Sequence, residues 1–436
     1  MSLSQEQQAV INALTKGDNV FVTGAGGTGK SYLIDAIRKQ FRNCSVTSST
    51  GISALNIGGQ TIHRWSGIGA SAGVLPVGEI AAKVMTLPWN ADKKDIIRNC
   101  RLLIVDEISM LDAGFIDTLD KVLRNIRRWF SELEGSELLP FGGIQVAFFG
   151  DFLQLPPVNK NNSQVTQFAF EANVWQEAEI KTHLLTKVFR QENQIFSDML
   201  NRIRIGEPTQ KDILTLSMKN NQIPYQDAIS PIEVFAKNAQ ADLCNSKHFL
   251  KLPDTKIFSY TAQDIATPPV TQSQEKIYLE QIDKDCIAPK VLTLKKDAQV
   301  MLLKNVDPDN GFVNGSIGKV VDFIGDTPIV LFTNGKTLPI DSETWELKED
   351  KKTVCTRRQL PLRLSYGITI HKVQGMTLDS VMCDLSGVFE DGQAYVALSR
   401  AKTLDGLYLK GFSRGRIFSN KKCVNFYRQL KEYNYV

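Results

Sequence analysis

Residues 19–31 read Asn-Val-Phe-Val-Thr-Gly-Ala-Gly-Gly-Thr-Gly-Lys-Ser, and this stretch decides which fold we expect. Apolar residues 20–22 predict a buried parallel strand, and the helical spacing of apolar residues at 33–37 predicts a helix after the glycine-rich turn. Between them, residues 24–31 match the phosphate-binding loop pattern G-x-x-x-x-G-K-[ST]. The strand–turn–helix context argues against the alternative, a glycine-rich turn followed by a chance Lys-Ser pair. The chain is therefore expected to bind a nucleoside triphosphate.

Each residue type in this loop has a physical role. Glycines let successive backbone N–H groups curl around phosphate oxygens, and the helix N-terminus adds positive potential. The predicted phosphate contacts of this kind are Gly26, Gly27, Thr28 and Gly29. Lys30 can reach the β- and γ-phosphates, and the Ser31 hydroxyl can ligate Mg²⁺. A nucleoside triphosphate and Mg²⁺ are therefore the expected ligands.

Length and composition indicate a globular protein of more than one domain. The chain has 436 residues, of which 42% are hydrophobic and 22% charged. Its net charge of +4 does not by itself indicate a protein that binds nucleic acid, but Lys and Arg outnumber Asp and Glu after Arg400. That basic end suits a polyanion or, equally, a solvated helix face.

Cysteine spacing and hydropathy bear on the compartment. The seven cysteines are scattered and form no C-x-x-C pair, which predicts neither a zinc site nor a disulfide framework. A signal peptide and an apolar run of transmembrane length are both missing from the sequence. We therefore expect a cytoplasmic protein that does not enter a membrane.

The order of apolar runs predicts an α/β protein with two insertions. Strand-like runs alternate with helical patterns through residues 1–180, as in a doubly wound domain. A stretch at 64–90, rich in Gly, Ala, Ser and Pro, breaks the alternation and is interpreted as a small surface insertion. A second α/β domain is expected from 181–254 and 356–436. Residues 255–355 carry short runs and an Asn-Gly hairpin signal, which predict an inserted β subdomain.

Two further predicted strands end in polar residues that suit hydrolysis. The apolar run 102–105 leads into Asp106, which would hold Mg²⁺ through water, and Glu107, which would orient or deprotonate the attacking water. The alternative is an ordinary acidic strand end, but the presence of the phosphate loop in the same chain favours the catalytic interpretation. The run 148–150 leads to Gln154, which is placed to sense the γ-phosphate or its water. A structural turn would explain the neighbouring Gly-Asp and Pro-Pro pairs but would leave Gln154 without a role.

Two arginines are candidates for stabilising charge on the phosphoryl group. Arg190 follows the strand-like run 184–188, and Arg400 ends a predicted helix at 392–399. An arginine finger contributes roughly 10³–10⁵ in rate. The alternative is a surface arginine at the end of an element.

Polar loops elsewhere are candidate contacts to nucleic acid. They offer hydroxyls, amides and helix N-termini that suit phosphate and sugar contacts without reading base sequence. The candidates are Thr50, Gly51, Thr61, His63, Asn238, His371, Lys372 and Thr377. Each of these loops, taken alone, is also an ordinary polar loop. Trp65 is a candidate wedge for parting a duplex, with plain core packing as the alternative.

In this order the segments resemble a superfamily-one helicase, and most closely the petite-integration-frequency (Pif) family. Residues 3–7 look like its glutamine motif, which implies Gln7 (or Gln8) as the adenine contact, and residues 369–377 look like a later motif, which implies Gly375 in the nucleotide site. A further set of residues is similar to the signature of the family itself. This set consists of Asp112, Phe115, Leu119, Asp120, Arg124, Arg127 and residues 140–145.

The resemblance implies two RecA-like domains with ATP between them and a Src-homology-three-like subdomain in the second. It also implies 5′→3′ movement on single-stranded DNA and unwinding of duplexes and forks, with four-stranded guanine structures and RNA–DNA hybrids left open. Roles in DNA repair, recombination and replication belong to the family. A telomere role is in doubt because the sequence lacks long N-terminal extensions, which favours a bacterial or viral core enzyme. A monomer is expected, and a DNA-induced dimer is left open.

Two other functions remain compatible with the phosphate loop. One is an ATP-driven translocase or protein remodeller that does not unwind DNA. The other is an ATP-gated module that binds or loads single strands.

Overall fold

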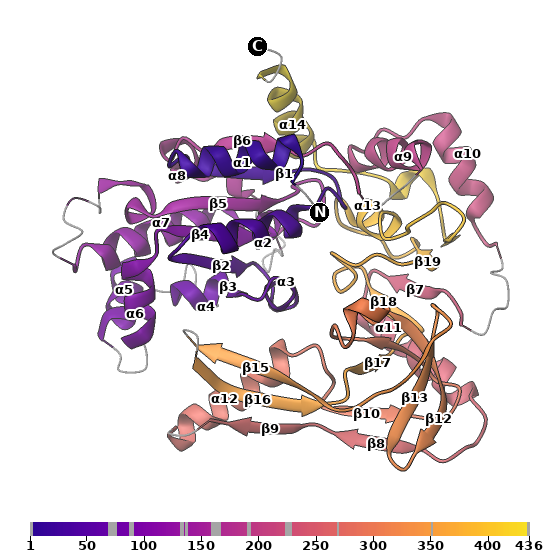
Figure 1. Ribbon diagram of the computed structural model, residues 1–436. Helices are drawn as coiled ribbons and strands as arrows, with labels where there is room; N and C mark the ends of the chain where they lie inside the picture. Colours follow the sequence, from indigo (N-terminus) through magenta and orange to yellow (C-terminus); the bar gives the residue numbers. More distant parts are fainter. Residues whose placement is uncertain are drawn as a thin grey trace. The chain divides into compact units, whose positions relative to one another are not determined.

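The computed structural model describes ten stretches of the chain. They are residues 3–68, 76–86, 91–130, 135, 138–157, 167–189, 193–222, 229–267, 270–349 and 352–433. The chain folds into two compact units, coloured along the sequence in Figure 1. The first contains Met1–Arg190, Glu390–Gly392 and Ser419–Val436, and the second contains Gln191–Phe389 and Gln393–Phe418.

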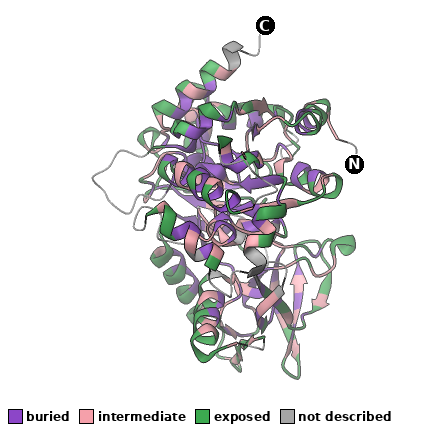
Figure 2. Ribbon diagram, turned by 90° about the vertical axis from the view of Figure 1, so that its left-hand side faces the viewer, coloured by how far each residue is buried: buried purple, intermediate pink, exposed green. Residues whose placement is uncertain are grey.

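A six-stranded parallel sheet organises the first unit, with strand order β3-β2-β4-β5-β1-β6. Its strands are β1 (Val20–Thr23), β2 (Cys44–Ser48), β3 (Gln60–Thr61), β4 (Leu102–Asp106), β5 (Gln145–Gly150) and β6 (Lys181–Leu184). Strands β1 and β4 are buried along their whole length, as expected for continuous apolar runs in a sheet that helices cover on both faces. Figure 2 shows these strands as a buried layer between helices whose outer faces are exposed.

Helices of the first unit are mostly amphipathic. They are α1 (Gln5–Thr15), α2 (Lys30–Gln40), α3 (Gly51–Asn56), α4 (Ile62–Ser66), α5 (Val77–Thr86), α6 (Ala91–Asn99), α7 (Ala113–Arg127), α8 (Asn173–Glu177) and α14 (Lys421–Tyr433). Short 3₁₀ turns occur at η3 (Ile108–Met110), η6 (Pro140–Gly143) and η7 (Ala169–Glu171). Apolar residues of α1 and α2 form one core cluster with β1, β4 and β5.

The insertion expected at 64–90 is only partly covered by the described residues, because 69–75 and 87–90 fall outside them. Within it, α5 packs against α7. Trp65 is 1% exposed in the core, so its interpretation as a wedge is wrong and the packing alternative holds.

A four-stranded parallel sheet organises the second unit, with order β18-β7-β19-β20. Its strands are β7 (Ile232–Phe235), β18 (Gly367–Thr369), β19 (Val381–Asp384) and β20 (Leu407–Lys410). The helical elements here are α9 (Gln194–Arg204), α10 (Gln210–Lys219), α11 (Asn238–Lys251), α13 (Gln393–Leu398) and the 3₁₀ turn η9 (Arg414–Arg416).

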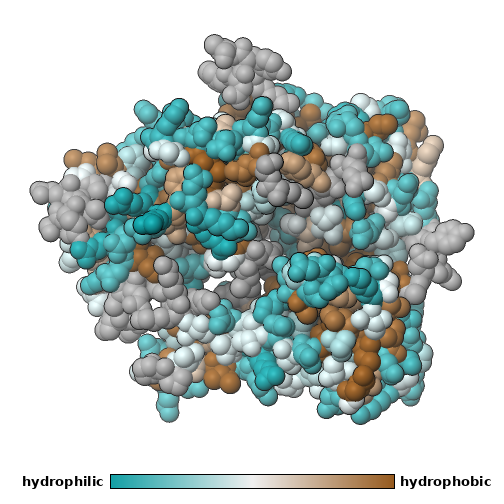
Figure 3. Space-filling model, viewed as in Figure 1, coloured by the Kyte–Doolittle hydropathy of each residue, from teal (hydrophilic) through white to brown (hydrophobic). Residues whose placement is uncertain are grey.

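An antiparallel β region lies in the sequence between β7 and β18, as the short apolar runs predict. Its five-stranded sheet has the order β14-β13-β12-β11-β17, a three-stranded sheet has the order β15-β16-β9, and β10 pairs with β8. The elements are β8 (Phe258–Thr261), β9 (Gln263–Ala266), α12 (Gln272–Asp285), β10 (Val291–Leu294), β11 (Gln299–Leu302), η8 (Pro308–Asn310), β12 (Ile317–Ile324), β13 (Thr327–Phe332), β14 (Thr337–Pro339), β15 (Glu343–Glu349), β16 (Lys352–Gln359) and β17 (Leu362–Leu364). The Asn334-Gly335 turn joins β13 to β14. Figure 3 shows an apolar patch over the β12–β13 hairpin, where Ile324 is exposed.

Two boundaries differ from those expected. The strand assigned to the start of the second domain is β6, and it pairs with β1 in the first unit. The C-terminal helix α14, expected in the second domain, also packs in the first unit, where Phe426 stacks on Phe170 with ring centroids 4.3 Å apart. Helical periodicity shows which face of α14 is apolar, but it does not show which core that face fills.

The described helices do not include one with the length and apolar character that crossing a bilayer requires.

Candidate active site

The loop between β1 and α2 makes close contacts that exclude side chains at two glycines. A Cβ at Gly24 would lie 2.4 Å from the Leu185 carbonyl oxygen. Gly29 has φ +82°, and a Cβ there would lie 2.8 Å from Gln7 Nε2. Only glycine tolerates both constraints, so the backbone can curl tightly here and leave its N–H groups for an anion.

Lys30 and Ser31 begin α2 directly after this loop. The Lys30 ammonium donates hydrogen bonds to the carbonyl oxygens of Gly24 at 2.7 Å and Ala25 at 3.1 Å. The Thr28 hydroxyl also donates to the Ala25 carbonyl, at 3.0 Å. The Ser31 side chain is exposed. The Lys30 ammonium therefore lies against the backbone of the loop that would bind phosphate.

Asp106 ends β4 and is 5% exposed. The Ser53 hydroxyl donates to its Oδ2 at 3.3 Å. Burial raises the pKa of the Asp106 carboxyl above its ordinary value, whereas the Glu107 backbone N–H, the Lys30 ammonium and Ser53 act in the opposite direction. A buried carboxylate needs partners for its negative charge, so one with so few hydrogen-bond donors around it suits a bound cation.

Glu107 follows in the left-handed conformation, with φ 53° and ψ 44°. This conformation is costly for a residue with a side chain, and such strain concentrates at functional sites. The strain thus lies at the residue that the sequence predicts to act on the attacking water.

Gln154 is held by a residue that is absent from the sequence-based predictions. Asp151, fully buried after β5, accepts a hydrogen bond from Gln154 Nε2 at 3.3 Å and another from the Leu153 N–H at 3.1 Å. Gln154 itself is 5% exposed. The Gly-Asp pair at the end of an apolar strand is the signal that could have identified Asp151.

Gln7 connects α1 to the phosphate loop. Its Nε2 donates to the Gly29 carbonyl oxygen at 3.3 Å. Its Oε1 accepts from the Ser4 N–H at 3.0 Å, and the Ser4 hydroxyl accepts from the Gln7 N–H at 3.2 Å, which is a capping box at the start of α1. The adenine contact expected at Gln7 stays a prediction, as it does at Gln8, which is exposed and bonded to Asn12.

Two further residues beside the loop are absent from the sequence-based predictions. The Glu6 carboxylate accepts hydrogen bonds from the backbone N–H and the hydroxyl of Thr186. The Phe189 N–H donates to the Gly27 carbonyl oxygen at 2.8 Å, and the Phe189 ring is 51% exposed. An exposed aromatic ring tied to a phosphate loop suits stacking on a base.

The topology explains why these groups converge. Strands β1, β5 and β4 are neighbours and run parallel, so their carboxyl ends meet at one edge of the sheet. Asp106 is the last residue of β4, and Lys30 and Gln154 follow the ends of β1 and β5. Such an edge is where open α/β sheets bind ligands.

The roles of the two predicted arginines stay predictions. Arg190 lies outside the described residues. Arg400 belongs to the second unit and is 1% exposed. Its guanidinium donates to the carbonyl oxygens of Val396 at 2.9 Å and Met376 at 3.1 Å, and to the Ser399 hydroxyl at 2.9 Å. A finger role would require the guanidinium to leave these acceptors.

The candidate DNA contacts of the first unit lie at helix starts. Thr50 precedes α3, which begins at Gly51, and its hydroxyl accepts from the Ser53 N–H at 3.2 Å. Thr61 caps α4, and the His63 ring packs against Phe115 with centroids 4.5 Å apart. These groups are partly used within the fold, so their contacts to DNA stay predictions.

The candidate contacts of the second unit lie after β7 and β18. Asn238 is exposed at the start of α11, and Lys372 is half-buried after β18, next to His371. Thr377 and Gly375 are exposed in the following turn, and Gly375 has φ +83°. Desolvation and the nearby Arg363 guanidinium lower the pKa of the Lys372 ammonium. A pair of desolvated cations suits a polyanion, and the assignment of Gly375 to the nucleotide stays a prediction.

Comparison with known proteins identifies the family. Residues 2–213 match the model of the PIF1-like helicase family, and residues 278–323 match that of the DNA helicase Pif1 2B domain. The ATP-dependent DNA helicase PIF1 of Danio rerio is 37% identical over 99% of this chain and 64% of its own length. The ATP-dependent DNA helicase RRM3 of Saccharomyces cerevisiae is 33% identical over 98% of this chain and 68% of its own length.

The chain belongs to the PIF1-like helicase family. It spans about two thirds of the length of these curated relatives. Among solved structures, Pif1 from a Bacteroides species in complex with ADP-AlF4 is 30% identical, with a TM-score of 0.82 over 99% of this chain and 98% of that one. Bacteroides Pif1 with ADP-AlF3 and single-stranded DNA is 31% identical, with a TM-score of 0.66 over 99% and 98%. The expected fold class, two RecA-like domains with an inserted β subdomain, is confirmed.

In this PIF1-like chain the signature residues hold α7 to η6. The Asp120 carboxylate accepts from Arg124 Nε at 2.9 Å and from the Phe141 N–H at 2.6 Å. The Arg127 guanidinium donates to the carbonyl oxygens of Ile97 and Cys100. Asp112 caps α7. These contacts hold α7 in place against its neighbours. Within the described residues, the signature therefore has a structural role.

Proposed function

We propose that this chain is an ATP-dependent DNA helicase that moves 5′→3′ along single-stranded DNA and unwinds duplex DNA. One observation carries the proposal: in a PIF1-like chain, the carboxyl ends of three adjacent parallel strands carry Lys30, Asp106, strained Glu107 and Gln154 at or just after their last residues. The curated relatives are named ATP-dependent DNA helicases, and one solved relative holds a nucleotide analogue and single-stranded DNA. The 5′→3′ direction rests on family resemblance.

The residues of the first unit fit a Mg²⁺-bound triphosphate. The glycine turn offers N–H groups, and the buried Asp106 carboxylate is close enough to Lys30 for the ammonium to lower its pKa. Ser31, and Asp106 through water, would hold Mg²⁺, whose charge would offset that of the phosphates. Lys30 would bind the β- and γ-phosphates when a nucleotide replaces its carbonyl partners.

Hydrolysis would depend on Glu107 and Gln154. Glu107 would accept a proton from the attacking water, and Gln154 would orient that water. Asp151 would fix the Gln154 amide through the observed hydrogen bond. Arg190 and Arg400 would stabilise charge on the transferred phosphoryl group, and Gln7 with Phe189 would hold the base. The DNA would run along Thr50, Gly51, Thr61 and His63 of one unit and Asn238, His371, Lys372 and Thr377 of the other.

An unwinding assay on duplexes with 5′ or 3′ single-stranded tails tests this function, together with ATP hydrolysis measured with and without DNA. We expect unwinding of the 5′-tailed duplex, hydrolysis stimulated by DNA, and loss of both in Lys30→Ala. Unwinding of only the 3′-tailed duplex would contradict the direction. Hydrolysis indifferent to DNA would favour a protein remodeller, and DNA binding without turnover would favour an ATP-gated binding module.

Further properties belong to the same proposal. We expect a cytoplasmic monomer, with DNA-induced dimerisation tested by sedimentation on forked DNA. Four-stranded guanine structures and RNA–DNA hybrids are further substrates to test in the unwinding assay.

A further inference from the structure

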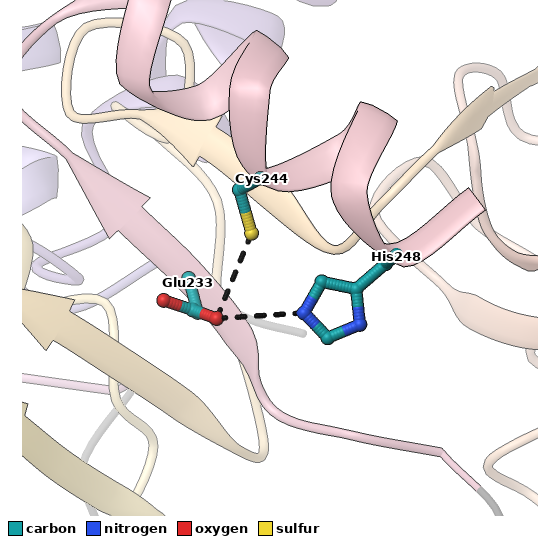
Figure 4. Close-up of side chains that lie close together, drawn as sticks. All are labelled: Glu233, Cys244 and His248. Carbon is teal, nitrogen blue, oxygen red and sulfur yellow. Dashed lines mark hydrogen bonds and ion pairs between the residues drawn. The ribbon is translucent and has the colours of Figure 1, made fainter. Parts of the chain in front are cut away.

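Three potential metal ligands of different kinds meet in the second unit (Figure 4). Glu233 comes from β7, and Cys244 and His248 come from α11. The Cys244 thiol lies 3.6 Å from Glu233 Oε1, and His248 Nε2 lies 3.8 Å from the same oxygen. All three ligand atoms lie within 4.8 Å of one another. Cys244 is buried, and the other two side chains are partly exposed, so an ion could reach them.

The elements that carry these ligands are held tightly together. A Cβ at Gly367 on β18 would lie 2.9 Å from the Cys244 Cβ, so α11 packs directly on the strand. Asn245 fixes that contact, because it donates to the Gly367 carbonyl oxygen at 2.8 Å and accepts from the Tyr366 N–H at 3.0 Å. The His248 ring stacks on Tyr366 with centroids 4.6 Å apart and planes 12° apart. Ligands on rigid elements are already close to a binding geometry.

We propose that Glu233, Cys244 and His248 form a zinc-binding site. Thiolate, imidazole and carboxylate together are the ligand set of Zn²⁺, which commonly takes three protein ligands and a water in a tetrahedral site. Cys244 and His248 are four residues apart on one helix, a spacing that places two ligands on the same face. The hard cation Mg²⁺ prefers all-oxygen sites, so it does not compete well here. Zinc would clamp β7 to α11.

Charge and protonation are consistent with this site. Burial and the Glu233 carboxylate raise the pKa of the Cys244 thiol to about 12, so the thiol keeps its proton and donates a hydrogen bond to Glu233 Oε1. Metal binding therefore releases this proton, and affinity rises with pH. The thiolate and Glu233 then supply two negative charges to a dication. Lys247 and Lys410 also act on the Cys244 thiol, in the direction that favours the thiolate.

Metal titration of the whole chain tests the proposal without any measurement of helicase activity. The chain is freed of metal with a chelator and titrated with Zn²⁺ against a chromophoric competitor in excess Mg²⁺. Co²⁺ then serves as the optical probe. We expect one Zn²⁺ per chain and, with Co²⁺, a tetrahedral visible band and a near-ultraviolet thiolate-to-cobalt band. Cys244→Ala and His248→Ala each remove a ligand and should weaken binding by at least about a hundredfold, because loss of a mere supporting contact already costs about 10–100-fold.

Two more variants keep the test decisive. Glu233→Gln preserves shape and should also weaken binding, whereas Cys383→Ala, which removes a buried thiol on β19 of the same unit, should leave binding unchanged. Zinc binding that is equal in the wild type, Cys244→Ala and Glu233→Gln would overturn the proposal. So would a wild type that binds no zinc, or a cobalt spectrum without the thiolate band. With any of these outcomes, the three side chains would form only a hydrogen-bonded cluster of thiol, carboxylate and imidazole, with no metal site.

Discussion

At the scale of single residues, the proposed chemistry depends on side chains whose local backbone or burial is unusual. Glu107 adopts a left-handed conformation at the end of β4, and Asp106 beside it is buried with a raised pKa. Arg400 is an equally unusual case, since a guanidinium predicted to reach phosphate is buried among carbonyl groups. Substitution of these residues separates chemical roles from structural ones.

Glu107→Gln should abolish hydrolysis while nucleotide binding persists. The amide keeps the shape of the side chain but cannot take a proton, and loss of a general base costs typically 10²–10⁴ in rate. Single-turnover hydrolysis and fluorescent-nucleotide binding measure the two effects. Lys30→Ala is the control that should lose binding as well. A Glu107→Gln variant that still turns over would remove the general-base role.

Arg400→Ala tests a finger against a structural arginine. A finger predicts at least a hundredfold slower hydrolysis with unchanged affinity for single-stranded DNA. A structural role predicts a lower melting temperature, because several buried carbonyl groups lose their donor at about 1–3 kcal/mol each. Arg400→Lys keeps the charge and serves as the comparison. A stable Arg400→Ala variant with normal turnover would exclude both roles.

At the scale of elements, buried hydrogen bonds fix helices that the sequence pattern alone leaves unplaced. The hydroxyl of Tyr427 on α14 is 2.5 Å from Thr23 Oγ1, at the end of β1, and accepts from the Phe152 N–H at 3.1 Å. Thr23 precedes the phosphate loop and Phe152 precedes Gln154 by two residues. A helix from the far end of the chain thus contacts the residues that precede the phosphate loop and Gln154, on two sides of the candidate nucleotide site.

Tyr427→Phe should therefore affect ATP use more than DNA binding. The ring still fills the aromatic core, but the buried Phe152 N–H loses its acceptor, at a cost of about 1–3 kcal/mol. We expect a lower melting temperature and a raised KM for ATP, with affinity for single-stranded DNA unchanged. Tyr408→Phe on β20 is the matched control in the second unit. An unchanged KM would restrict Tyr427 to a packing role.

The pairing of α9 with α10 should depend on pH. Asp212 lies in the capping box of α10, and its carboxylate accepts from Arg202 of α9 at 2.7 and 2.8 Å. The Arg202 pair lowers the Asp212 pKa from 3.8 to about 2. Because the folded-state pKa is the lower one, this stabilisation is complete above the unfolded pKa and is lost as pH falls toward 2. Asp212→Asn should flatten the pH dependence of the free energy of unfolding between about pH 4 and 2. An unchanged profile in that variant would contradict the assignment.

At the scale of the whole molecule, two units each contribute candidate contacts to a polyanion. Contacts to phosphates release counterions, so affinity falls steeply with salt whatever the base sequence. The second unit contributes Lys372, whose pKa is lowered by desolvation and Arg363. The net charge of +4 conceals this local arrangement.

Lys372→Ala should reduce the salt dependence of single-strand binding. Loss of one phosphate contact lowers the slope of log affinity against log salt by about 0.7 for single strands. Fluorescence anisotropy over a salt series, with DNAs of different sequence, measures it. Lys276→Ala, at an exposed lysine of α12 paired with Glu280, is the control that should keep the slope. Equal slopes in the two variants would remove Lys372 from the DNA path.

The sequence by itself determined the phosphate loop, the acidic end of β4, the α/β alternation and the inserted β region, because each is encoded by residues close together in the chain. Contacts between distant residues were decided only by the tertiary structure. They include β6 at the edge of the first sheet, the Tyr427 hydroxyl of α14 beside Thr23 at the end of β1, and the meeting of Glu233 with Cys244 and His248. Periodicity shows which face of an element is apolar, but the choice of partner depends on which distant surface buries that face best.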